Sequence, residues 1–363
     1  MTNLETAPTE QVCADTLDPD APALELLTAR EVPLGGIRAM TVRRTIPQRR
    51  RSFIGAWCFL DHYGPDDVAV TGGMRVPPHP HTGLQTVSWL FSGEVEHRDS
   101  LGTHAFVRPG ELNLMTAGRG ISHSEDSTDR TTTLHGVQMW VVLPEAHRDT
   151  APAFTHHVAQ VTEVPGGQVS VFLGSLVGVT SPVATFSPLL GAEVRLRAGT
   201  TLTVDVDTTF EHGILVDDGA VTVGVLARDI EEDVTRADLL YAAPGVRQLT
   251  LTAHQDTLLL LIGGRPLGEQ VVMWWNFIGR DHGEIETARR EWQAEIGADD
   301  ATVARAGDTT AGATETADLA GDEGVPPVPV HDPDGRRYGH VDGHPDAPLP
   351  APPLPNHRLK PRS

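Results

Sequence analysis

The chain has 363 residues and a formal net charge of −21, with 39% apolar residues, 36 glycines and 28 prolines. This length allows two domains with sizeable cores, and the many turn residues are typical of a β protein. The negative charge repels phosphate backbones, which argues against direct, tight binding to nucleic acid. The N-terminus lacks the basic and apolar runs of a signal peptide, and no run of about 18 apolar residues could span a membrane. We therefore expect a cytoplasmic protein without a membrane segment.

The first 30 residues are rich in Thr, Asp, Ala and Pro and show no hydrophobic period. Such a segment cannot bury enough apolar surface to offset its ordering entropy, so we expect residues 1–30 to be disordered. The basic run Arg43–Arg51 follows, and we interpret it as a solvated strand edge, with an anion site as the alternative. Ordered structure is expected to begin near residue 31.

Between residue 31 and residue 280 the chain alternates short apolar runs with Gly, Pro and Asp turns. Runs such as LQTVSWLF, GVQMWVVL, TLTVDV and TLLLLIGG are rich in Val, Leu and Thr, and strands at this spacing are typical of sandwiches or barrels. Two stretches, beginning FSGEVEHRDS and VDDGAVTVGV, share one order of strands and glycine turns, which indicates a duplication. The sequence therefore predicts an all-β fold with two domains, residues 31–150 and 151–280.

A helix is predicted over residues 281–297. Apolar residues recur there at helical spacing in EIETARREWQAEIG, and Gly297 can end the helix in a left-handed conformation. The following Ala/Thr/Asp-rich stretch carries no such period. We expect residues 298–363 to form a mostly disordered tail.

His79 and His81 lie two residues apart in the stretch PPHPHTGLQ. In a strand, residues i and i+2 point to the same face, so both imidazoles can reach one ion, and the adjacent prolines restrict the backbone. His123 and Glu125 repeat this spacing in GRGISHSED. Two such pairs on facing strands would present three imidazoles and one carboxylate to a single metal.

This donor set is typical of a first-row transition metal with exchangeable positions. Four protein ligands leave two positions of an octahedron open, which suits Fe(II), Mn(II), Ni(II) or Co(II), whereas structural zinc more often carries cysteine. We expect Fe(II), with the other metals, zinc included, as alternatives. A lone HxH is more often a surface pair, but the second pair favours a shared metal. The other histidines of this half lack an i+2 partner that is a ligand of the same kind: His62, His97, His104 and His135.

The motifs FLDHYGP, HPHTGLQTVSWLFSGEVEHRDSLG, RPGELNLMTAGRGISHSE and HGVQMWVVLP closely resemble the pirin family in order and spacing. GMRVPPHPH and GRGISH are similar to the two cupin signatures, and the resemblance covers roughly residues 30–295. It implies a bicupin, with two jelly-roll barrels. The iron of the first barrel would be bound by four residues that match the family's ligands: His79, His81, His123 and Glu125.

The resemblance also carries two departures from general cupins. Gln85 stands where the first cupin signature often has glutamate, and Glu125 is the carboxylate ligand instead, which is the pirin variant. The second barrel has only His212 at the comparable point, so we expect it to hold no metal. Residues 334–355 resemble the terminal stretch of bacterial pirins, which implies that this part of the tail docks onto the body.

For the function, the resemblance implies an Fe(II) dioxygenase of the quercetin 2,3-dioxygenase type. The partners would be an aromatic, flavonol-type substrate and dioxygen, with Glu125 as both ligand and catalytic base. Gln138 is a candidate to hydrogen-bond the substrate, with an ordinary polar position on its strand as the alternative. The alternative is a non-catalytic, redox-responsive iron protein that modulates transcription factors or metabolic enzymes, with Arg43–Arg51 as its protein-binding surface.

Overall fold

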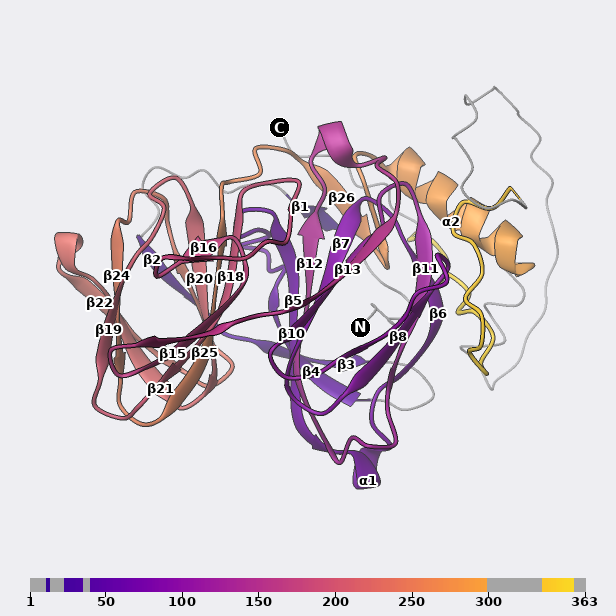
Figure 1. Ribbon diagram of the computed structural model, residues 1–363. Coiled ribbons are helices and arrows are strands. Elements are labelled where there is room, and N and C mark those ends of the chain that lie inside the picture. Colours follow the sequence, from indigo (N-terminus) through magenta and orange to yellow (C-terminus); the bar gives the residue numbers. More distant parts are fainter. Residues whose placement is uncertain (1–10, 14–22, 35–39, 299–334, 356–363) are drawn as a thin grey trace.

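Strands dominate this computed structural model, which describes residues 11–13, 23–34, 40–298 and 335–355 (Figure 1). They form two barrels that lie side by side, each with a seven-stranded and a four-stranded sheet. The all-β fold with two domains, predicted from the short strands and the internal repeat, is therefore confirmed, as are the two barrels that the resemblance implied.

The strands of the first barrel pair in antiparallel fashion, and four of the pairings contain a β-bulge or a similar irregularity. Its seven-stranded sheet has the order β13 (Ala153–Val158), β10 (Glu111–Thr116), β7 (Leu84–Ser92), β12 (Thr133–Val142), β5 (Trp57–Asp67), β4 (Met40–Ile46) and β3 (Arg30–Leu34). Its four-stranded sheet has the order β6 (Arg75–His81), β11 (Ile121–Ser127), β8 (Val95–Asp99) and β9 (His104–Val107). Two short helices, α1 (Val68–Thr71) and η1 (Glu145–His147), lie in the connections.

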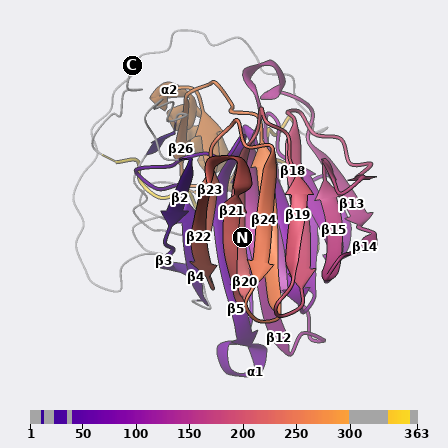
Figure 2. The same cartoon turned by 90° about the vertical axis from the view of Figure 1, so that its left-hand side faces the viewer.

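The second barrel repeats this layout, and its four-stranded sheet forms its outer face (Figure 2). The seven-stranded sheet has the order β14 (Val161–Val164), β15 (Gly167–Leu173), β18 (Leu189–Leu196), β25 (Thr257–Gly264), β20 (Glu211–Asp218), β23 (Leu239–Ala242) and β2 (Leu24–Leu27). The outer sheet has the order β19 (Thr201–Asp205), β24 (Gln248–Ala253), β21 (Ala220–Val225) and β22 (Ile230–Thr235). A small hairpin and a turn of helix complete it: β16 (Ser175–Leu176), β17 (Val179–Thr180) and η2 (Leu226–Arg228). Alternate residues of β24 are buried, as the period of a half-exposed strand requires.

The barrels meet through their seven-stranded sheets, which lie face to face in the middle of the molecule (Figure 1). One buried apolar cluster takes side chains from both: Trp57, Leu60, Val87, Trp89, Val137 and Met139 from the first barrel, and Phe172, Leu173, Leu189, Leu215, Leu260 and Ile262 from the second. Trp89 Nε1 donates to Glu193 Oε2 at 2.8 Å, and Trp57 Nε1 donates to the carbonyl of Gly263 at 3.0 Å. These polar anchors within an apolar contact fix the barrels relative to each other.

The barrels exchange segments, so their boundaries differ from those expected. Leu24–Leu27 pairs with β23 of the second barrel, although residues 1–30 were expected to be disordered. Conversely, β13 was expected in the second domain, residues 151–280, but it pairs with β10 of the first barrel. A further sheet, formed by β1 (Gln11–Cys13), β26 (Val271–Trp274) and β27 (Phe277–Gly279), also packs on the first barrel. A sheet edge accepts any segment with free backbone groups, and local composition does not reveal that pairing. Residues 1–10 and 14–22 lie outside the described residues.

The interpretation of Arg43–Arg51 as a solvated strand edge is wrong for two of its arginines. The Arg44 guanidinium is buried and pairs with Asp61 through two contacts of 2.6 and 2.9 Å. Arg51 is buried, lies 3.6 Å from the centre of the Tyr241 ring, and pairs with Glu25 of β2 at 3.0 Å. These two ion pairs contribute to the integrity of the fold, because removing either partner would leave an uncompensated buried charge.

The predicted helix is α2 (His282–Ile296), which lies at the outer side of the first barrel (Figure 1). The Asp281 side chain caps its N-terminus by accepting from Glu284 N, and Gly297 ends it in the left-handed conformation. No helix among the described residues has both the length and the apolar character needed to cross a membrane.

Residues 335–355 of the tail lie against α2 and the first barrel. Tyr338 is buried, and its hydroxyl donates to the carbonyl of Ala288 at 3.0 Å. Its own carbonyl accepts from Ser122 N of β11 at 3.0 Å. Arg75 of β6 pairs with Asp346 through contacts of 2.6 and 2.7 Å. This part of the tail is therefore a docked strap, while residues 299–334 and 356–363 lie outside the described residues.

Candidate metal centre

The first histidine pair is positioned by an edge strand and a glycine turn. His79 and His81 lie in β6, the edge strand of its sheet, where prolines are tolerated because the lost N–H groups need no ladder partner. Gly83 follows with φ +71°, and a Cβ there would lie 2.4 Å from the carbonyl oxygen of Ile278. Only glycine fits this turn, which leads the chain from the ligand strand into β7.

The second pair comes from β11, the neighbour of β6. His123 lies directly opposite His79 in the strand register. The centres of the imidazole rings are 4.3 Å apart for His79 and His123, and 5.0 Å apart for both other pairs with His81. One ligand atom from each of the three lies within 4.8 Å of the others. Adjacent strands thus bring three imidazoles together at one point.

The hydrogen bonds of these rings leave the ligand nitrogens open. His79 Nδ1 lies 2.9 Å from the Pro77 carbonyl and His81 Nδ1 lies 3.1 Å from the Asn276 carbonyl, so both Nδ1 atoms carry the proton and donate. The Nε2 atoms of both rings and of His123 are buried, and none has a hydrogen-bond partner among the described residues. Buried polar atoms without partners are costly. A metal ion fits here because it would satisfy all three lone pairs.

Burial keeps these imidazoles neutral. It lowers the pKa of His79 to about 3 and lowers the pKa of His81 and of His123 well below the ordinary value. A neutral imidazole is the form that binds a metal, so the ligands are in the required state over the physiological pH range.

Glu125 lies beside this group and shares His123 with it. Its carboxylate belongs to a second group of potential ligands, formed with His97 and His123, whose ligand atoms lie within 4.8 Å of one another. A β-bulge between His123 and Glu125 shifts the pairing, so that Glu125 lies opposite Val76. The four expected ligands therefore fall into two overlapping groups that share His123, and the second group also contains His97.

Sequence reasoning set His97 aside, although the structure brings it into the centre. His97 and Asp99 lie in β8, opposite Glu125 and His123 respectively. His97 Nδ1 is 3.5 Å from His123 Nδ1, and His97 Nε2 is 3.1 Å from Asp99 Oδ2. The sequence does contain an indication of this position, because His97 and Asp99 are a histidine and a carboxylate two residues apart. This third i,i+2 pair orients His123, as second-shell partners of metal ligands do.

Gln138 and Gln85 have different surroundings in the same barrel. Ser88 Oγ lies 2.8 Å from Gln138 Oε1 and 3.1 Å from Glu125 Oε1, which links the two side chains. Gln138 Nε2 is buried and has no hydrogen-bond partner in the described part of the chain. Gln85 donates to Thr116 Oγ1 at 2.9 Å. Of the two amides, Gln138 retains a donor for a ligand.

His212 is buried in the second barrel on β20. Within the described ranges, no group of three His, Cys, Asp or Glu ligand atoms includes it. Buried apolar side chains from both sheets pack the interior of this barrel, including Val223, Leu249 and Leu261.

Known proteins share both barrels. The chain matches the Pirin family over residues 38–141 and the Pirin C-terminal cupin domain over residues 191–296. It is 41% identical to a Pseudomonas aeruginosa protein described as a candidate quercetin 2,3-dioxygenase, over 78% of this chain and 90% of that protein. A crystal structure of quercetin 2,3-dioxygenase from Acinetobacter baumannii aligns with a TM-score of 0.76 at 30% identity, covering 93% of this chain and 98% of that one.

A pirin from Escherichia coli, solved in complex with nickel(II), shares the fold with a TM-score of 0.51 at 20% identity, covering 67% of this chain and 99% of that one. The two family domains, one for each barrel, and the 41% identity agree with each other. The chain therefore belongs to the pirin family.

Proposed function

We propose that the protein is an Fe(II)-dependent dioxygenase that acts on flavonol-type substrates, with the metal bound by His79, His81, His123 and Glu125. The observation that carries this proposal is the set of three buried Nε2 atoms that point at each other without hydrogen-bond partners among the described residues. Three imidazoles and a carboxylate leave coordination positions for two further ligands on Fe(II). The names of the two relatives at 41% and 30% identity support the reaction class.

A bound ferrous ion would supply the Lewis acidity that lowers the pKa of a flavonol hydroxyl and the redox chemistry with dioxygen. The residues of the chain position the substrate and its proton. Glu125 accepts the hydroxyl proton, and Ser88 links its carboxylate to Gln138. The buried Gln138 amide donates a hydrogen bond to a substrate oxygen, and the stacked rings of Trp140 and Phe59, 4.2 Å apart beside His81, exclude water.

Oxygen uptake with quercetin tests this proposal. Fe(II)-loaded protein should consume oxygen and bleach the flavonol, while Glu125→Gln should be slower by about 10²–10⁴-fold because an amide cannot accept the proton. The iron content of the variant must be measured alongside. His104→Ala is a matched control, since His104 is an exposed histidine of the same barrel paired with Glu96. Equal rates for iron-loaded and metal-free protein would exclude the reaction with this substrate.

The basic run offers the regulatory alternative only part of its expected surface, because Arg49 and Arg50 are exposed but Arg44 and Arg51 are not. Arg44 and Arg51, which it would use as a protein-binding surface, are buried in ion pairs within the chain. Their guanidinium groups are therefore not available to a partner protein.

A further inference from the structure

We propose that His62, His135 and Asp217 form a second metal site, between the barrels, for a zinc-class divalent ion that carries an anionic exogenous ligand. His62 on β5 and His135 on β12 belong to the first barrel, and Asp217 on β20 belongs to the second. One ligand atom from each lies within 4.8 Å of the other two. Two histidines and one carboxylate with an open position are a common catalytic zinc set.

Two β-bulges, one in each barrel, aim these side chains at one another. The register of β12 shifts at His135 against both of its neighbours, β5 and β7. The register of β20 against β25 shifts between Val216 and Asp218, which leaves Asp217 as the extra residue. Bulges redirect single side chains and are frequent beside functional sites.

The three side chains already lie in close contact. His62 Nε2 and His135 Nε2 each lie 2.6 Å from the same atom, Asp217 Oδ1, and the contact from His62 is a short hydrogen bond. His135 Nε2 and the buried Asp217 Oδ2 have no hydrogen-bond partner in the described part of the chain. A metal bound by the three side chains would displace the shared proton of the His62 contact and would satisfy these two atoms.

The protonation states also suit a cation. Burial lowers the pKa of His62, which keeps its imidazole neutral. Burial alone would raise the pKa of Asp217, but the close contacts of its carboxylate with His135 and His62 hold it at about 2. A neutral imidazole and an ionised carboxylate are the forms that bind metals.

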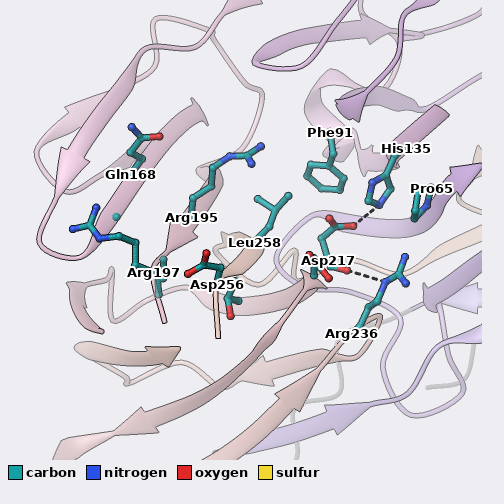
Figure 3. Close-up of a pocket in the computed structure, with 14 residues that line it drawn as sticks. Pro65, Phe91, His135, Gln168, Arg195, Arg197, Asp217, Arg236, Asp256 and Leu258 are labelled. Carbon is teal, nitrogen blue, oxygen red and sulfur yellow. Dashed lines mark hydrogen bonds and ion pairs between the residues drawn. The ribbon is translucent and has the colours of Figure 1, made fainter. Parts of the chain in front are cut away.

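A pocket of about 600 Å³ opens onto this cluster, and its lining carries three arginines and three aspartates, Asp217 included (Figure 3). His135 and Asp217 line it together with Arg195 and Arg236, and Arg236 Nε donates to the Asp217 carbonyl at 3.1 Å. Arg43 Nε donates to His62 Nδ1 at 3.4 Å, and the Arg43 and Arg236 guanidinium groups both donate to the Gly64 carbonyl. These guanidinium groups disfavour a bare divalent ion and favour an anion in its open position. The pocket therefore selects a metal together with a small carboxylate-type anion.

Cobalt titration separates this site from the first one. A His79→Ala/His81→Ala protein should still bind about one Co(II) per chain, with the intense visible absorption of four-coordinate cobalt. Adding His135→Ala should abolish that absorption, and His135 is the safest ligand to replace because it is not fully buried. Asp217→Asn should have the same effect, with thermal melting to confirm folding. His104→Ala should leave the cobalt spectrum unchanged.

Acetate then tests the anion. It should shift the cobalt spectrum of the His79→Ala/His81→Ala protein, and Arg236→Gln should weaken this response about tenfold or more while cobalt stays bound. If the double variant binds no cobalt, or binds it equally after His135→Ala, the site does not exist. If acetate leaves the spectrum unchanged, the anionic ligand is wrong. None of these readouts uses quercetin, so failure of the dioxygenase proposal would not affect them.

Discussion

The four-stranded sheet of the first barrel buries histidines and carboxylates, whereas the corresponding sheet of the second barrel buries leucine and valine. In the first, β6, β11 and β8 each carry a polar pair two residues apart. In the second, alternate positions of β24 and β21 add to an apolar cluster. Both sheets have the same place and strand number in their barrels. One scaffold thus supports two kinds of interior.

This difference indicates how the fold stays stable although one barrel has a polar interior. Three imidazoles with unsatisfied Nε2 atoms destabilise the first barrel when no ligand satisfies them. The second barrel supplies an apolar interior and half of the inter-barrel core. Stability and chemistry are therefore unequally distributed between the two barrels, so a substitution in one barrel should affect mainly one of these properties.

The largest effect is expected from removing the first histidine pair. His79→Ala/His81→Ala, made in a His135→Ala background so that the inter-barrel cluster does not contribute, should lose its iron. Oxygen uptake with quercetin should fall at least about a hundredfold, since ligands contribute more than the 10–100-fold of their second-shell partners. Elemental analysis and an oxygen electrode measure both. Iron retained at the level of the His135→Ala protein would contradict the assignment of the ligands.

The second barrel should instead respond in stability. Leu261 is fully buried in its apolar cluster, and Leu261→Ala should reduce the free energy of unfolding by about 2–5 kcal/mol. Activity per folded molecule should not change, because the residue is remote from the metal ligands. Denaturant unfolding gives the first quantity, with exposed Leu226→Ala as the control. A loss of activity greater than the loss of folded protein would show that the second barrel contributes to activity as well as to stability.

Docking of the tail to the first barrel should depend on pH. His344 Nε2 lies 2.9 Å from Asp126 Oδ2, and although burial lowers it, this contact raises the pKa of His344 above its ordinary value. The pair's contribution is complete below about pH 6.5 and is lost as the pH rises through the raised pKa. The protection of residues 335–355 from hydrogen exchange, relative to the intrinsic base-catalysed rate at each pH, should thus fall several-fold at alkaline pH, in keeping with about 1 kcal/mol for a partly exposed pair.

The control for this pH dependence is the exposed neighbour His340, which lies 3.8 Å from Asp342. His344→Ala should remove the pH dependence of the protection of residues 335–355, and His340→Ala should retain it. An unchanged profile in the His344→Ala protein would assign the effect to another group.

The smallest effect is expected at His212. His212→Ala removes a lone imidazole that belongs to no ligand group among the described residues. Metal content and oxygen uptake should stay within about twofold of the unchanged protein, since one neutral ligand cannot hold a divalent ion against water. A drop in bound metal equal to that of the first-barrel variant would show that the second barrel also takes part.

Features that depend on local periodicity could be predicted from the sequence alone. The i,i+2 spacing of His79/His81 and of His123/Glu125 places each pair on one face, because side chains in a strand repeat every two residues. The cap residues and apolar period of α2 are local in the same sense. The duplicated order of strands and turns predicted two barrels for the same reason.

The tertiary structure alone decided which distant segments meet. The burial of Arg44 and Arg51, the pairing of Leu24–Leu27 in the second barrel, and the place of His97 beside His123 all depend on neighbours that come from elsewhere in the chain. His62 and Asp217 are 155 residues apart and belong to different barrels. Strand register and bulges determine such contacts, and a shift of one residue would turn each side chain to the opposite face of its sheet.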